Sequence, residues 1–128
     1  MNDFLNKLVA YFEELETGYP VKIGIFDEEE SILITPISGS EVTHEYMNGM
    51  MDVRLPFEIS IKESNQEKAF NAIAQLVSSL RQFKPFLDKE EKYDFLELSI
   101  TEEPFLENGE KDGFFVYTTK ISAHLTLF

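Results

Sequence analysis

The fold of this chain is decided by residues 50–80, which read MMDVRLPFEISIKESNQEKAFNAIAQLVSSL. Within 57–62, apolar and polar side chains alternate, which predicts a strand with one apolar face. After residue 64 the apolar spacing changes to three and four residues, which predicts an amphipathic helix. Its predicted stripe consists of Phe70, Ile73, Ala74, Val77 and Leu80, supported by Ala69 and Leu76. A half-buried strand that leads into such a helix indicates a fold built from both elements.

The ends of these two elements carry local signals. Ser64 is followed three residues later by Glu67, the pattern of a capping box at a helix start. On the other side, Asn48-Gly49 predicts a tight hairpin turn, because both residue types tolerate positive φ. The arms of that hairpin are expected at about residues 41–47 and 50–62, with a bend at Pro56.

The rest of the chain extends this pattern in both directions. An apolar stripe over residues 4–15 predicts a first helix, and 21–26 and 31–37 predict two short strands. After the second helix, strands are expected at 93–101 and 114–128, separated by a polar, flexible tip. The order α-β-β-β-β-α-β-β predicts a single α+β domain over residues 1–128. We expect antiparallel hairpins in an antiparallel or mixed sheet, with both helices packed on one face.

Composition and charge exclude several classes of function. The chain has 11 Lys and Arg against 24 Asp and Glu, a formal net charge of −13. Phosphate backbones and anionic lipids bind basic surfaces, so specific nucleic-acid binding and membrane docking are not expected. There is no cysteine, and the two histidines, His44 and His124, have no partners typical of a nucleophilic site. With no Gly-rich phosphate loop either, we predict no catalytic residues, no cofactor and no enzymatic activity.

One acidic run could serve as a cation site. Asp27, Glu28, Glu29 and Glu30 are consecutive, and hard cations take several carboxylates. The run lacks the alternating Asp and Asn and the Gly of an EF-hand loop. We therefore interpret it as a solvated turn and predict no metal.

Large apolar side chains fall on both faces of two predicted hairpins. They are Met47, Met50 and Met51 in the first, and Phe114 and Phe115 in the second. If the helices cover only one face of the sheet, the other apolar groups favour contact between subunits; a two-sided core is the alternative. Arg54 lies in the least acidic third of the chain, and either pairs with an acid of a neighbouring subunit or keeps the surface hydrated.

Four segments together resemble one family. Residues 32–40 are similar to an apolar strand followed by Pro and a Gly turn, 45–49 to a Tyr-x-Asp/Asn-Gly turn, and 55–59 to a Pro-Phe strand. Residues 65–80 resemble the helix that follows them. In order and spacing the likeness is to siphophage minor capsid proteins, also described as tail terminator or tail-completion proteins.

The resemblance implies a structural role in a virion. Such proteins form a ring, usually a hexamer, on the last ring of the tail tube, where they stop tube growth and join the head connector. DNA passes through the lumen without specific binding. The family implies assembly in the bacterial cytoplasm and residence in the virion neck, with the tail tube protein and head connector proteins as partners. An acidic lumen suits this role, because it repels the DNA backbone; Asp27–Glu30 is the first candidate lining and residues 102–113 the second.

Two other classes remain open from the residues. An acidic mimic of DNA could block a DNA-binding partner, although its carboxylates would need a regular array. A small α+β binding module, or an enzyme that uses Asp, Glu, Tyr or one histidine, is the other alternative. No leader or bilayer-spanning run is visible near the start of the sequence, so we expect no membrane association.

Overall fold

The computed structural model describes residues 2–15, 17–24, 30–82, 93–111 and 113–127. Its elements are α1 (Asn2–Glu14), β1 (Val21–Ile23), β2 (Ser31–Pro36), β3 (Glu41–Glu45), β4 (Met51–Glu63), α2 (Gln66–Leu80), β5 (Tyr93–Lys111) and β6 (Phe114–Leu127). This is the predicted α+β fold in the predicted order.

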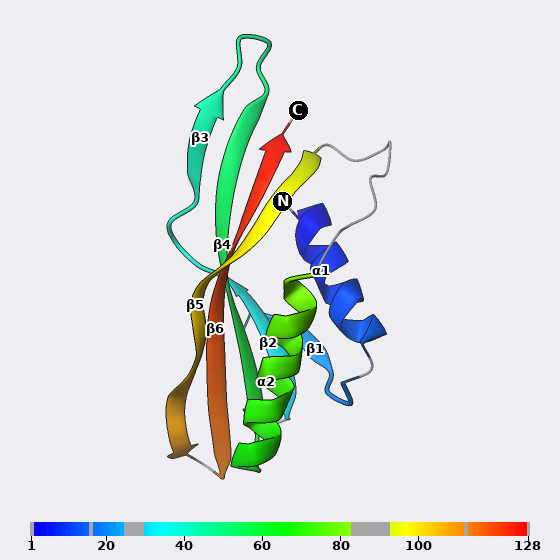
Figure 1. Ribbon diagram of the computed structural model, residues 1–128, viewed down its shortest axis with the longest axis vertical. Coiled ribbons are helices and arrows are strands. Elements are labelled where there is room, and N and C mark those ends of the chain that lie inside the picture. Colours follow the sequence, from blue (N-terminus) through cyan, green and yellow to red (C-terminus); the bar gives the residue numbers. More distant parts are fainter. Residues whose placement is uncertain (1, 16, 25–29, 83–92, 112, 128) are drawn as a thin grey trace.

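The strands form one mixed, six-stranded sheet (Figure 1). β4 and β6 lie at its centre and pair antiparallel along their length, from Met51 opposite Leu127 to Glu63 opposite Phe115. On the other side of β4, β3 pairs with its first residues and β2 with its last ones. β5 pairs with β6 and forms the opposite edge.

The first strand pair differs from expectation. β1 lies parallel to β2, with Val21 opposite Ile32 and Ile23 opposite Ile34, so the expected antiparallel hairpin is wrong here. Two backbone hydrogen bonds hold this register: the Ile32 amide donates to the Pro20 carbonyl at 2.9 Å and the Gly24 amide to the Ile34 carbonyl at 3.2 Å. Gly24 has a φ of 102°, which lets the chain turn away after three paired residues.

Both helices pack on one face of the sheet and share a single core (Figure 1). From α1 the core takes Phe4, Leu8 and Phe12, all with no exposed surface. The inward positions of β4 and β6 supply its other wall, which includes Phe57, Ile59, Ile61, Ile121, Ala123 and Leu125. The Tyr11 hydroxyl donates to the Ser79 carbonyl at 2.7 Å, which ties α1 to α2.

The second helix begins one residue later than predicted, and the face that it buries differs from the predicted apolar stripe. Its N-cap is Asn65, whose side chain accepts a hydrogen bond from the Lys68 amide at 3.0 Å. The buried residues are Ala69, Ala72, Ile73, Leu76, Val77 and Leu80. Phe70 is 52% exposed and Ala74 is also exposed, so both were wrongly assigned to the apolar stripe. Phe70 lies beside the buried face of α2, where its ring contacts Tyr117 of β6.

β5 is longer than predicted and irregular. It runs to Lys111, so most of the segment expected as a flexible tip is paired strand. The pairing with β6 shifts register five times, and Pro104 falls inside the strand. Proline is tolerated there because β5 is an edge strand, where its missing N–H costs no ladder hydrogen bond.

Candidate interaction surfaces

The first candidate surface is a hairpin that projects from one end of the molecule (top of Figure 1). We call residues 41–53 the arm. Its turn is closed by the Tyr46 amide, which donates to the Met50 carbonyl at 2.8 Å. Gly49 supplies the required positive φ of 89°, as the Asn-Gly pair predicted. Every residue of β3 is exposed, so the arm contributes little to the core.

Polar side chains stiffen the base of the arm. Asp52 accepts hydrogen bonds from the Thr126 hydroxyl at 2.6 Å and from the Tyr46 hydroxyl at 2.9 Å. The bond from Thr126 first, and then the bond from Tyr46, hold the pKa of Asp52 below its usual value. The bond between Tyr46 and Asp52 in turn raises the pKa of Tyr46. The His44 ring meets the edge of the Tyr46 ring at 4.4 Å. Together these contacts link β3, β4 and the end of β6.

The three predicted contact methionines have different surroundings. Met47 is fully exposed at the tip of the arm, Met50 is half-buried beside it, and Met51 packs against the core. Arg54 forms an ion pair with Glu41 across β3 and β4 of its own chain. Of these four residues, Met47 is the one whose side chain is left wholly to solvent.

Phe114 and Phe115 lie at the other end of the molecule, where β6 begins (bottom of Figure 1). Phe115 packs against the core. Phe114 lies on the opposite face, with the Lys62 ammonium 4.4 Å from its ring centroid. The structure therefore does not bring the six predicted contact residues together, since they fall at two opposite ends.

Of the predicted acidic run, Asp27, Glu28 and Glu29 lie outside the described residues. Glu30 is described, and its carboxylate accepts a weak hydrogen bond from the Ser64 amide at 3.4 Å. Hydrogen bonding to the neighbouring Glu63 raises the pKa of Glu30. Glu63 is buried and also accepts a hydrogen bond from the Tyr19 hydroxyl. Burial first, and then this hydrogen bond, raise the pKa of Tyr19. Glu30 thus takes part in a hydrogen-bonded cluster that joins β4 to the start of α2.

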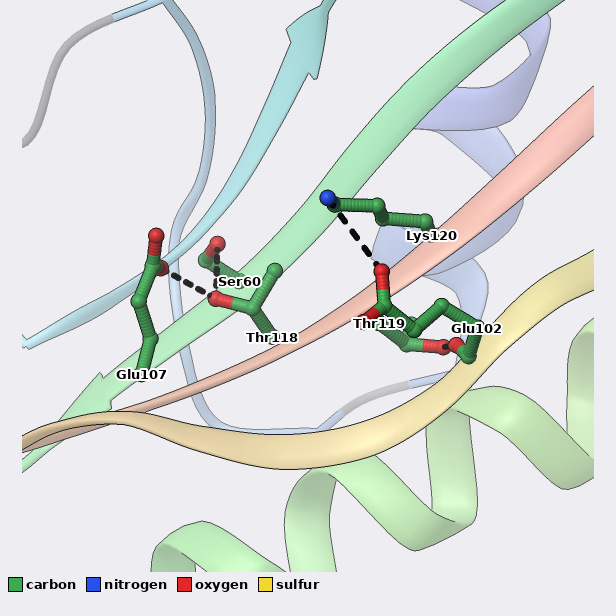
Figure 2. Close-up of polar contacts among 6 residues, drawn as sticks. All are labelled: Ser60, Glu102, Glu107, Thr118, Thr119 and Lys120. Carbon is green, nitrogen blue, oxygen red and sulfur yellow. Dashed lines mark hydrogen bonds and ion pairs between the residues drawn. The ribbon is translucent and has the colours of Figure 1, made fainter.

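The sheet face away from the helices is mostly polar. On this face Ser60 of β4, Thr118 of β6 and Glu107 of β5 form a chain of hydrogen bonds (Figure 2). Thr118 donates to the Glu107 carboxylate at 2.5 Å, so Ser60 is the donor in its 2.8 Å bond to Thr118. Nearby, Lys120 pairs with Glu102 at 3.2 Å. These contacts join the three longest strands across this face, where Ser60 and Thr118 are buried.

A second apolar surface, which we call the α2 patch, consists of Phe70, Leu106 and Tyr117. Phe70 is 52% and Leu106 is 41% exposed, whereas Tyr117 is buried, at 8% exposure. The Phe70 and Tyr117 rings meet edge to face at 5.8 Å, and Leu106 is opposite Tyr117 in the sheet. As a whole, this patch has no signature in the sequence, because it depends on the register between β5 and β6. In the sequence, the one sign of such a patch is Phe70, which stands at the margin of the apolar stripe of α2.

No protein-family model matches the chain, and no curated protein is significantly similar to it. In the described part of the chain, neither helix has the length and hydrophobicity needed to cross a bilayer. The same residues contain no group of three or more His, Asp or Glu side chains arranged to hold a metal ion.

Proposed function

We propose that this chain is a structural subunit of a phage tail that caps the tail tube as a ring, stops its growth and joins it to the head connector. The observation that carries the proposal is the placement of two dissimilar exposed surfaces at opposite ends of one elongated sheet. One is the projecting arm and the other is the α2 patch, on the helix that begins at the far end (Figure 1). Unlike surfaces on one chain favour heterologous contacts, and such contacts close into rings when the rotation permits.

The charge of the chain is compatible with a passage for DNA. With a net charge of −13, the assembled ring would present a negative field to the phosphate backbone. DNA would then slide through the lumen without being held. The acids proposed for the lining are Asp27–Glu30 first and those of residues 102–113 second; in the second group, Glu102 pairs with Lys120 and Glu103 with Arg81 of the same chain.

The proposal is tested by native mass measurement over a range of protein concentrations, followed by negative-stain imaging with purified tail tubes. We expect rings, with six copies as the reference number, or a cap at one end of each tube. A chain that stays monomeric at every concentration and leaves tube ends bare would contradict the proposal. In that case, inhibition of a DNA-binding protein by the acidic chain becomes the next measurement.

A further inference from the structure

We propose that the outer edge of β3 binds an extended, basic segment of another protein, which pairs with β3 as an added strand and places an apolar side chain in an adjacent pocket. β3 pairs with β4 along one edge, and its other edge faces away from the molecule (Figure 1). No further strand of the described residues pairs with that edge. All five residues of β3 are exposed, so the backbone donors and acceptors of its outer edge are accessible to a partner strand.

Of the edge strands in the described sheet, β3 is the best suited to receive a partner. β1 has three residues and is followed by a turn at Gly24. Pro104 and five shifts of register interrupt β5. β3 has five residues and one shift of register, between Val42 and His44. The hydrogen bonds at Asp52 already hold the arm in position, which lowers the entropy cost of binding.

A pocket lies beside β3, on the sheet face that carries the helices. Its volume is about 160 Å³, and its lining consists of Ser40, Glu41, Val42, Val53, Leu55 and Leu127. Val53 and Leu55 are buried core residues, whereas Val42, on the edge strand, is 49% exposed. A cavity of about 150 Å³ with apolar walls holds a benzene ring. The pocket therefore accommodates an aromatic or branched apolar side chain from a strand beside Val42.

The charge around this edge selects the kind of strand that can pair with it. Residues 41–53 contain three acids and no Lys or Arg. Arg54 pairs with Glu41, whereas Glu45 and Asp52 leave the arm negative. Facing residues of paired strands stabilise the pair when their charges are opposite and destabilise it when they are alike. A partner strand that alternates Lys or Arg with apolar residues therefore matches both the charge and the pocket, because its alternate side chains point to opposite faces.

A second copy of the chain does not meet these requirements. Two β3 strands paired along their outer edges would bring Glu41 and Glu45 of each copy close to the same acids of the other. β1 leads into the acidic run Asp27–Glu30, and β5 carries exposed acids. Since no edge strand of the described sheet carries more than one Lys or Arg, the partner is a different protein.

The test uses the full chain and the synthetic peptide Lys-Val-Lys-Phe-Lys-Val-Lys, blocked at both ends. Binding is followed by NMR, from the shifts of amide signals and from the exchange of β3 amides with solvent. We expect shifts in β3 and at the pocket residues Val53 and Leu55. At about ten times its Kd, the peptide should slow the exchange of β3 amides about tenfold, because it binds only the closed arm.

Altered peptides and protein variants separate strand pairing from charge. N-methylation of the central Lys-Phe-Lys removes donors from both backbone edges of the peptide and should abolish the shifts in β3. Replacing the Phe of the peptide by Ala should weaken binding at least about tenfold, since the pocket then buries less apolar surface. Glu45→Lys should weaken binding about two- to fivefold, the scale of a surface charge pair. Glu13→Lys on α1, the matched change in net charge, should change binding little.

Three outcomes would overturn the proposal. The first is an unmodified peptide that leaves the β3 amides unshifted, and the second is a set of shifts centred on β1 or β5. The third is equal binding of the N-methylated peptide, or of a peptide with Glu in place of each Lys, since neither fits a basic strand paired with β3. The assay contains no tail tube, so its result is independent of the tube-capping experiment.

Discussion

At the scale of single residues, Asp52 links the arm to the body of the protein. Its carboxylate accepts hydrogen bonds from Thr126 on β6 and Tyr46 on the arm, and these bonds lower its pKa from the ordinary value of 3.8. A carboxyl whose pKa is lower in the folded state stabilises the fold above the unfolded-state pKa. That stabilisation is lost as the pH falls through the lowered folded-state value.

We therefore predict that Asp52→Asn lowers the urea midpoint at pH 7 and that the difference from the parent chain shrinks as the pH falls below 3.8. Urea denaturation followed by circular dichroism at several pH values measures this. Glu13→Gln, at an exposed position of α1, serves as the control. A difference that stays constant with pH would mean that the carboxylate is not held in its charged form by these contacts.

At the scale of elements, the start of α2 shows how far sequence patterns reach. Ser64 and Asn65 are both good cap residues, and only the structure shows that Asn65 takes this place. The Asn65 amide then donates to Glu63 at 3.1 Å, so the acid that completes the cap precedes the helix and Glu67 has no such role.

This assignment predicts that Asn65→Ala lowers the free energy of unfolding by about 1 kcal/mol, the usual cost of losing an N-cap. Ser64→Ala should change it by less than about 0.5 kcal/mol, as for most exposed positions. Chemical denaturation of both variants checks this. Equal losses of unfolding free energy in the two variants would contradict the assignment of Asn65 as the N-cap.

Sequence patterns predicted the order of the elements because alternation in β4 and the spacing in both helices report burial directly. They failed where burial depends on a distant partner. Phe70 is 52% exposed because the face of α2 that packs on the core is the one carrying Ala69, Ile73 and Leu76. The length of β5 was hidden by Pro104 and by its shifted register. Leu106 was missed for the same reason, since its place beside Tyr117 depends on the register between β5 and β6.

At the scale of the whole molecule, one core contains both helices and the central strands, while β3 of the arm lies outside it. Amides of β2, which pairs with β4 beside the core, should exchange with solvent only on global unfolding. Amides of β3, which pairs with the same strand, should exchange at least about a hundredfold faster by local opening. Hydrogen exchange measured by NMR checks this, and equal protection of β2 and β3 would show that the arm opens only with the core.

The irregular outer edge of β5 has a consequence for how copies of the chain meet. A long, regular edge strand accepts further strands without limit, which leads to fibres. Here Pro104, five shifts of register and exposed carboxylates interrupt that edge. A strand of another sheet therefore cannot form a regular ladder of backbone hydrogen bonds with β5. This holds at any pH, because protonating the carboxylates leaves the proline and the register shifts in place. The backbone of β5 is therefore a poor template for a further strand, and a molecule that met this edge would contact its side chains.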